Sequence, residues 1–377
     1  MDIILQMYIN ENLGDDLFID IIAKRYPNIN FTIFGIGNRQ IPFIYETKYN
    51  NVHIMPINKY LCKINAIGKV IFKRDMILEK KLKKCDGLIT LGGSVFIDSP
   101  IPFEAFKANV LADVRLHALK IKKPTFVIGA NFGPVYHEKF INKYKKYFSK
   151  CINVSFRDSK SKRDFENLDN VISTTDVVFN YPEKDILIKN KTVGISIIDL
   201  SDGSHSKIAS YQKIYEEKMV EIINEFIKLG YNVNMYSFCN KQKDNIAIYR
   251  IMDSISNKDN VKCFEYNDLN IDGFIEHFAT NEYIIATRFH SMILGLIQKQ
   301  KVFPVVYDIK TKNVIDELQL ENYCSLDTID KLKIDDIIKT KKYVNINKMK
   351  DKANQQFIAF ENYYKLKVGD ENEKNII

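Results

Sequence analysis

The strongest constraint on the fold is a repeated alternation of short apolar runs with longer segments of helical period. The runs do not alternate in polarity, so they are typical of strands buried on both faces of a parallel sheet. In the first half, strands are predicted at residues 3–7, 30–36, 87–91, 124–129 and 152–156. This order of strands and helices predicts an α/β protein.

The same pattern restarts at Thr192, after a polar segment around Pro182 that suits a linker. Its strands are predicted at residues 192–198, 232–238, 261–265, 283–287 and 302–307. We therefore expect two Rossmann-like domains, residues 1–182 and 183–344, that face each other across a cleft. Residues 345–377 are predicted to form a C-terminal helix and tail, with the helix packing back toward the first domain.

Composition narrows the class of protein without indicating an activity. The 377-residue chain has a net charge of +8, but its lysines stand among acidic neighbours, which disfavours a nucleic-acid binder. No residue cluster has the spacing of metal ligands and the six cysteines form no C-x-x-C pair, so metal-independent chemistry in a reducing compartment is expected. Without a signal-peptide pattern or a long apolar run, we expect a cytoplasmic protein.

Candidate ligand-binding residues follow the predicted strands, because ligands of parallel α/β sheets bind at the carboxyl ends of strands. Asn12–Asp16 follows the first strand. Asn12 or Asp15 can cap the next helix, which is the favoured interpretation, or the segment can line the cleft and bond a sugar hydroxyl.

Two glycine-containing segments follow later strands of the first half. Gly92-Gly93-Ser94 follows the strand at 87–91, and Gly129–Pro134, which contains Asn131, follows the next one. Glycines here either let backbone N–H groups approach a ligand closely or form turns that reverse the chain. Neither segment has the spacing of a dinucleotide-binding or Walker loop.

Two arginines at strand ends are the sharper signals. Arg157 follows the strand at 152–156, and it either pairs with a carboxylate for structure or binds an anionic ligand. Arg288 and His290 lie between an apolar strand and an apolar helix, whose N-terminus adds N–H donors and a positive field. This combination suits a phosphate and a carboxylate beside a proton-transfer group.

Taken in order, these segments resemble the polysaccharide pyruvyl transferase family. Their order and spacing make the resemblance specific, and it spans residues 12 to 310. The matching pieces are Asn12–Asp16, Gly92–Ser94, Gly129–Pro134, Phe156–Asp158 with Ser161, Thr175–Phe179, Arg288–His290 and Pro304–Lys310. The resemblance implies a glycosyltransferase type-B-like fold with the active site between two domains.

The resemblance also implies a reaction. The enolpyruvyl unit of phosphoenolpyruvate is transferred onto a sugar diol of a polysaccharide or its precursor as a cyclic ketal, and phosphate is released. Phosphoenolpyruvate is then the donor substrate, and no cofactor is expected. By this resemblance, Arg157 and Arg288 hold the phosphate and carboxylate, and His290 transfers protons.

The remaining substrate-binding candidates are Asn12, Asp15, Gly93, Ser94, Asn131 and Lys310. Lys310 is expected near the mouth of the donor site, with a solvated lysine as the equally weighted alternative. The end of the first strand of the second half departs from the family pattern, since the sequence there reads Gly194–Asp199 and many relatives carry an arginine after this strand. If the saccharide acceptor is lipid-linked, peripheral contact with the inner membrane leaflet is expected.

Two other functions remain open from the sequence. A nucleotide-sugar-dependent glycosyltransferase of the same fold would release a nucleoside diphosphate in place of phosphate. A non-catalytic sugar- or phosphate-binding relative would show ligand-dependent melting shifts without turnover.

Overall fold

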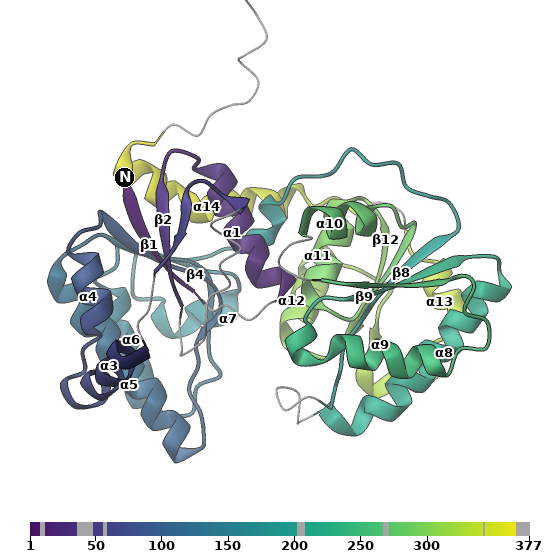
Figure 1. Cartoon of the computed structure of the whole chain (residues 1–377), viewed down its shortest axis with the longest axis horizontal. Helices are drawn as coiled ribbons and strands as arrows, with labels where there is room; N and C mark the ends of the chain where they lie inside the picture. Colours follow the sequence, from purple (N-terminus) through teal and green to yellow (C-terminus); the bar gives the residue numbers. More distant parts are fainter. Residues whose placement is uncertain are drawn as a thin grey trace, which may run out of the picture. The chain divides into compact units, whose positions relative to one another are not determined.

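The computed structural model describes residues 1–7, 12–35, 48–55, 59–201, 208–266, 271–341 and 344–366. The chain forms two compact units (Figure 1). The first unit takes its residues from 1–9, 18–177 and 351–377, and the second from 10–17 and 178–350. The domain limits expected from the sequence stay a prediction.

Within its described residues, the first unit contains a seven-stranded parallel sheet in the order β3-β2-β1-β4-β5-β6-β7. Its strands are β1 Asp2–Met7, β2 Asn30–Gly35, β3 Val52–Ile54, β4 Gly87–Phe96, β5 Thr125–Phe132, β6 Asn153–Phe156 and β7 Val171–Ser173. Its helices are α3 Lys59–Phe72, α4 Met76–Leu82, α5 Pro102–Ala118, α6 Glu138–Phe148, α7 Ser159–Lys162 and the larger part of α1 Leu13–Arg25, whose start belongs to the second unit. The α/β fold predicted from the apolar runs is confirmed.

Aromatic side chains fill one face of this sheet. Phe96 of β4 and Phe132 of β5 pack against Tyr144 and Phe148 of α6 with ring centroids 5.1–6.1 Å apart. Helices α5 and α6 lie side by side below the sheet in Figure 1, and α5 contributes Ala112 to the same core.

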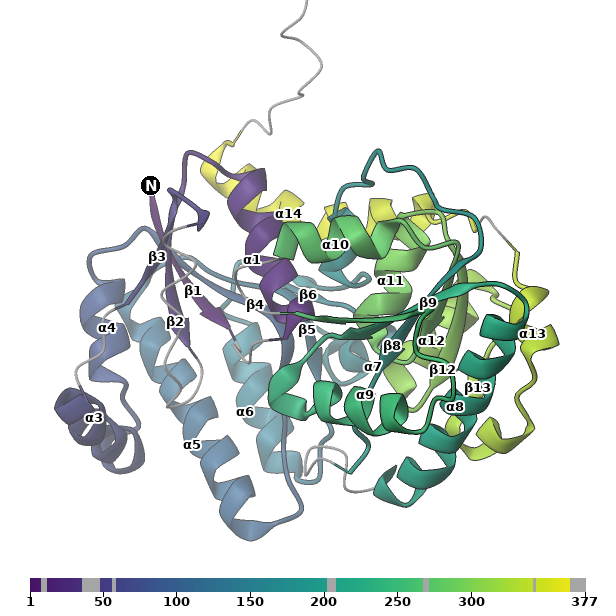
Figure 2. The ribbon, with the colours of Figure 1, turned by 45° about the vertical axis from the view of Figure 1, so that its right-hand side comes forward.

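The C-terminal helix α14, Asn347–Tyr364, covers the opposite face of the sheet (Figure 2). Its Phe360 packs against Phe126 of β5 and against Tyr26 after α1, with ring centroids 5.3 Å apart in both pairs. Glu361 pairs with Arg25 at 2.8 Å. The prediction that this helix returns to the first domain is confirmed.

The second unit contains a six-stranded parallel sheet within its described residues, in the order β10-β9-β8-β11-β12-β13. Its strands are β8 Thr192–Ile197, β9 Asn232–Ser237, β10 Val261–Glu265, β11 Tyr283–Ala286, β12 Lys301–Val306 and β13 Cys324–Ser325. Its helices are α8 Gln212–Lys228, α9 Asp244–Asp253, α10 Ile271–Ala279, α11 Phe289–Ile297, α12 Ile309–Leu318 and α13 Ile334–Ile338.

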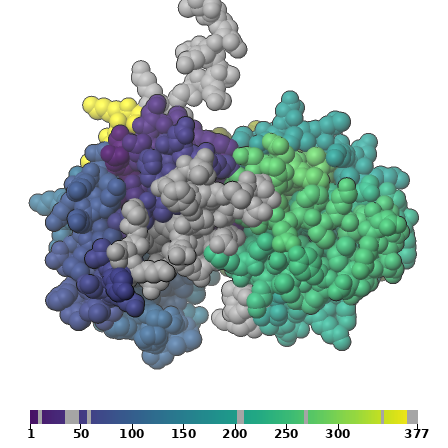
Figure 3. Space-filling view, viewed as in Figure 1, coloured from purple at the N-terminus to yellow at the C-terminus, as the bar shows by residue number. Residues whose placement is uncertain are grey.

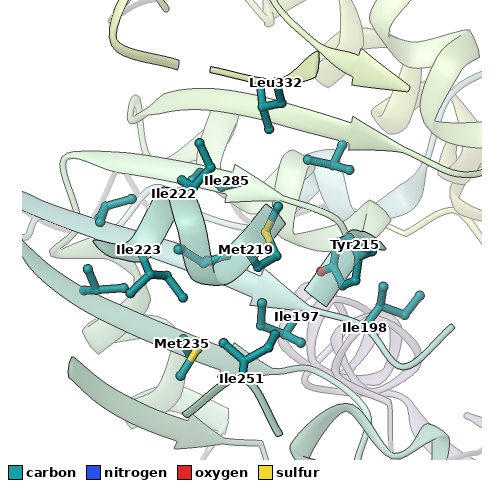
Figure 4. Packing of buried hydrophobic residues seen from close by; sticks show 14 of the residues in the cluster. Ile197, Ile198, Tyr215, Met219, Ile222, Ile223, Met235, Ile251, Ile285 and Leu332 are labelled. Carbon is teal, nitrogen blue, oxygen red and sulfur yellow. The ribbon is translucent and has the colours of Figure 1, made fainter. Parts of the chain in front are cut away.

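The core of the second unit forms where α8 and α9 cover this sheet. Tyr215, Met219 and Ile222 of α8 are fully buried at helical spacing, and they face Ile197 of β8 and Ile285 of β11 (Figure 4). Burying such side chains is the main favourable contribution to stability, about 1.5–3 kcal/mol for each. This packing fixes the sheet whose carboxyl end carries the residues described next.

Candidate functional site

Arg288 lies in a network of hydrogen bonds in the second unit. It is the N-cap residue of α11, directly after β11 and Thr287. The backbone N–H groups of Thr287 and Arg288 both donate to Oγ of Ser196 in β8, at 3.0 and 3.1 Å. Ser291 lies 2.6 Å from the same hydroxyl and donates to the Arg288 carbonyl. The start of α11 is therefore tied to the neighbouring strand.

The Arg288 guanidinium is buried and bound by a carboxylate. Its Nε donates to Asp244 Oδ2 at 2.9 Å, its Nη2 donates to Asp244 Oδ1, and its Nη1 donates to Gln242 at 2.5 Å. Burial alone would lower the pKa of Arg288, but the Asp244 carboxylate raises it above its usual range. Arg288 is therefore a fixed cation whose charge is balanced by Asp244.

His290 contacts the start of α1, which belongs to the same unit although it is far away in sequence. A Cβ atom built on Gly14 would lie 1.8 Å from Nδ1 and 2.2 Å from Cε1 of His290. Only glycine fits at this position without displacing the imidazole. The structure thus brings together two of the sequence-predicted segments, Asn12–Asp16 and Arg288–His290.

Asn12 caps α1, as favoured from the sequence. Its side-chain oxygen accepts from the Gly14 N–H at 2.9 Å, which satisfies one of the free donors at a helix start. The backbone N–H of Leu13 donates to the Phe238 carbonyl, just after β9, at 3.1 Å. These bonds hold the first turn of α1 on the second unit.

The two acidic residues of this turn have different surroundings. Asp16 is buried and accepts a 2.5 Å hydrogen bond from the Tyr266 hydroxyl. Asp15 is half-buried and lies close enough to Cys239 to raise the pKa of that thiol. Burial is the larger cause and Arg288 opposes it, and together they bring the pKa of Cys239 to about 11. Cys239 is therefore protonated and unreactive at neutral pH.

Lys310 lies beside the same helix start. Its Nζ pairs with Asp308 at 3.2 Å and lies 5.6 Å from the centre of the Phe289 ring. Phe289 is buried against His290, with ring centroids 5.1 Å apart. The structure therefore brings Lys310 to the Arg288–His290 segment.

The remaining sequence-predicted residues gather in the first unit. Arg157, after β6, donates to Asp176 at 3.0 Å and to Oδ1 of Asn131 at 2.8 Å. Ser94 of β4 donates to the same Asn131 oxygen at 3.0 Å. The sequence left open whether Arg157 pairs with a carboxylate or binds an anionic ligand, and the structure shows that it pairs with the carboxylate of Asp176. The carboxyl ends of three neighbouring strands thus share one polar network.

The prediction that the strand ends at Leu91 and that Gly92-Gly93-Ser94 follows it is wrong, because β4 continues through these residues to Phe96. Gly92 and Gly93 have φ of 60° and 71°, and the pairing with β5 shifts register after Gly93. A Cβ on Gly92 would lie 2.4 Å from the Phe18 ring. The glycines therefore serve a β-bulge and a close packing contact, which bends the strand at this network.

Sequence reasoning did not identify Asp244, Gln242 or Ser196. These residues follow β9 or end β8, so the rule that ligands gather at strand ends would have found them. Asp176 was noticed only as part of the family resemblance.

The described residues contain no group of three or more His, Cys, Asp and Glu residues that could hold a metal ion. Across the same residues, no helix is long and apolar enough to cross a membrane.

Comparison with known proteins identifies the family. The model of the polysaccharide pyruvyl transferase family matches residues 12–309. The chain belongs to this family. As a pyruvyl transferase family member, it is 26% identical over 346 residues to the amylovoran biosynthesis protein AmsJ of Erwinia amylovora, which covers 82% of this chain and 80% of that protein.

Solved structures with a similar fold include UDP-GlcNAc 2-epimerases. The enzyme of Methanocaldococcus jannaschii has a TM-score of 0.57 at 11% identity and covers 96% of this chain and 100% of its own. MnaA of S. aureus has a TM-score of 0.57 at 10% identity and covers 98% of both chains. At these identities the likeness shows the fold alone, which for this pyruvyl transferase family member is glycosyltransferase type-B-like.

Proposed function

We propose that this protein transfers the enolpyruvyl unit of phosphoenolpyruvate onto a sugar diol during polysaccharide biosynthesis. Membership of a transferase family supports the class of reaction, and the likeness to an amylovoran biosynthesis protein supports a polysaccharide acceptor or its precursor. The observation that carries the proposal is the contact of His290 with Gly14, because it joins two segments of the family pattern at one point.

In the proposed reaction His290 is the proton-transfer residue. One hydroxyl of the diol attacks C2 of the donor while the methylene carbon C3 is protonated. The second hydroxyl then attacks C2 as the C–O bond to phosphate breaks, so one hydroxyl proton ends on C3 and the other leaves with phosphate. An imidazole suits both transfers, because its ordinary pKa is near neutrality.

The donor carries a phosphate and a carboxylate, so fixed cations must bind it. Arg288 and Lys310 lie at the start of α11 and α12, and each has a carboxylate partner, Asp244 and Asp308. We propose that Asp244 orients Arg288 as a rigid donor ligand and that Lys310 adds charge at the mouth of the site. That Arg157 shares the same anion stays a prediction from the family resemblance.

We assign acceptor binding to the remaining polar candidates. Asn131 and Ser94 are joined by a hydrogen bond at the bulge of Gly93, and they present amide and hydroxyl groups that suit sugar hydroxyls. Asn12 and Asp15 are proposed to contact the substrate beside His290.

The direct test incubates the protein with phosphoenolpyruvate and candidate nitrophenyl or lipid-linked glycosides. We expect release of inorganic phosphate and a mass gain of one pyruvyl unit on the glycoside. Release of a nucleoside diphosphate from a nucleotide sugar would instead favour a glycosyltransferase. Ligand-dependent melting shifts without any turnover would favour a binding protein.

Substitution of His290 tests its role. His290→Ala and His290→Asn are expected to leave phosphoenolpyruvate affinity nearly unchanged while turnover falls about 100-fold or more. His53→Asn, an exposed histidine of β3, is the matched control and should retain full turnover. Near-normal turnover in His290→Asn would mean that the proton donor is Asp15 or Asp16.

A further inference from the structure

Helix α3 of the first unit faces the protein with its polar side and the solvent with its apolar side. Its inward residues are Asn65, Gly68 and Lys69: Asn65 donates to Asp75 at 2.8 Å, and Lys69 pairs with the same carboxylate at 2.7 Å. The ordinary arrangement of a surface helix is the reverse. Asp75 also caps α4, so these polar bonds hold α3 in place.

The outward side of α3 has the spacing of a buried helix face. Tyr60, Ile64, Ile67 and Ile71 follow one another at intervals of four, three and four residues, which places them in one stripe. The exposed apolar side chains of the helix are 46–79% exposed: Tyr60, Leu61, Ile64, Ile67, Val70, Ile71 and Phe72. We call this stripe and its flanks the α3 face.

The α3 face continues onto the start of α5. Ile101, Phe103 and Phe106 are also exposed there, and Nζ of Lys73, just after α3, lies 5.5 Å from the centre of the Phe106 ring. Figures 1 and 2 show α3 and α5 side by side at the lower edge of the first unit, and blue atoms from this part of the chain lie at the surface in Figure 3. An apolar patch of this kind marks an interaction site.

Basic residues accompany the apolar stripe. Residues 59–74 contain five basic residues and no acidic one, and two of the five, Lys69 and Arg74, pair with Asp75 and Glu79 at 2.7 and 2.5 Å. Lys63 is exposed beside the stripe. Lys107, which pairs with Glu104 at 2.9 Å, lies 4.2 Å from the centre of the exposed Phe103 ring. An apolar helix face with flanking lysines is the composition of helices that lie in the interface of an anionic bilayer.

We propose that the α3 face docks the protein on an anionic lipid surface. The apolar stripe enters the boundary between headgroups and acyl chains, and the flanking lysines contact lipid phosphates. Self-association through this face is disfavoured, because an isologous dimer would bring the basic residues of both copies into one interface. The inference goes beyond the proposed reaction and does not depend on it.

The test is sedimentation of the full-length protein with vesicles. We expect binding to vesicles that contain phosphatidylglycerol, little binding to phosphatidylcholine alone, and release by high salt. The double variant Ile64→Gln/Ile67→Gln should bind at least 10-fold more weakly and Lys63→Gln about 5-fold more weakly. Leu187→Gln, which changes an exposed leucine of the second unit, is the control and should bind as the parent does.

A fluorescence experiment locates the contact, because the chain contains no tryptophan. Ile64→Trp should show a blue shift of its emission on addition of anionic vesicles, and Leu187→Trp should not. Equal shifts for both variants, or parental vesicle binding by Ile64→Gln/Ile67→Gln, would overturn the proposal. So would a dimer in light scattering that the double variant converts to a monomer, without vesicle binding by the parent.

Discussion

The ring of His290 leaves no space for a side chain on Gly14. Because Nδ1, Cε1 and Cγ of the ring all lie within 2.6 Å of the position that a Cβ would take, the whole imidazole must move in Gly14→Ala. We expect Gly14→Ala to lower turnover at least 10-fold and to cost about 1–3 kcal/mol of stability, the usual cost of overpacking. Phosphate release and urea unfolding measure the two effects.

The control is Gly273→Ala in α10, where a Cβ would meet no atom within 4 Å. Alanine in a helix is favoured over glycine by about 0.5–1 kcal/mol, so this variant should be slightly stabilised and fully active. Equal activity of the two variants would contradict the importance of the Gly14–His290 contact.

Arg288 and Asp244 form a buried ion pair. Arg288→Met leaves a buried carboxylate without its counter-ion, so we expect a loss of about 3–5 kcal/mol in the free energy of unfolding. Asp244→Asn combined with Arg288→Met should cost less than the sum of the two single changes. Strictly additive costs in urea unfolding would show that the pair is not coupled.

The candidate site residues that the sequence indicates are those that follow apolar strands, such as Arg157, Arg288 and His290, and their roles stay a prediction. The strand-end rule can find some of their partners, but it does not say which residue pairs with which. Asp244 is 44 residues away from Arg288, and Gly14 is joined to His290 only because the start of α1 belongs to the second unit. Pairings of this kind depend on strand order, which a single sequence does not contain.

Among the elements, the predicted strands agree with the structure to within one residue at each end, except where strands extend past glycines. β4 and β5 continue to Phe96 and Phe132, because positive-φ glycines form bulges inside them. The short strands β3, β7 and β13 were missed, since two or three residues carry too little apolar pattern. All three strands lie at sheet edges, where fewer residues are buried and the apolar pattern in the sequence is therefore weaker.

The loops that follow β4 and β5 are joined by one carboxylate. Asp98 is buried and accepts from the backbone N–H groups of Ser99, Tyr136 and His137 at 2.8–2.9 Å, and its Oδ2 lies 3.0 Å from His137 Nδ1. Burial would raise its pKa, but these hydrogen bonds lower it below the usual value. Its stabilising contribution is therefore fully present above the unfolded pKa of about 3.9 and is lost as the pH falls through the lowered, folded pKa.

We accordingly expect Asp98→Asn to cost about 1.5–3 kcal/mol at pH 7, the value of hydrogen bonds to a charged group. The difference in the free energy of unfolding between the variant and the parent should narrow below about pH 4, because the Asp98 carboxylate of the parent is then protonated and its stabilising contribution is lost. Urea unfolding at both pH values is the measurement, with the exposed Asp169→Asn as the control. A cost that is the same at both pH values would refute the linkage.

At the scale of the whole molecule, the first unit depends on residues from the end of the chain. Phe360 is buried between Phe126 and Tyr26, whereas Ile358 on the same helix is exposed. Phe360→Ala should cost about 3–5 kcal/mol and Ile358→Ala less than about 0.5 kcal/mol. Thermal unfolding checks both, and similar melting temperatures for the two variants would contradict the packing of α14.

This dependence sets the order in which the units can be completed on the ribosome. The last residue that the second unit needs is 350, whereas the first unit also needs residues from 351 onward. At 5–20 residues per second, the 174 residues from Val178 to Asp351 take about 9–35 s to synthesise. Throughout that time the aromatic face of Phe126 and Tyr26 is without its covering helix. The half of the protein that is made first is therefore finished last, and its sheet is the surface that chaperones would have to protect.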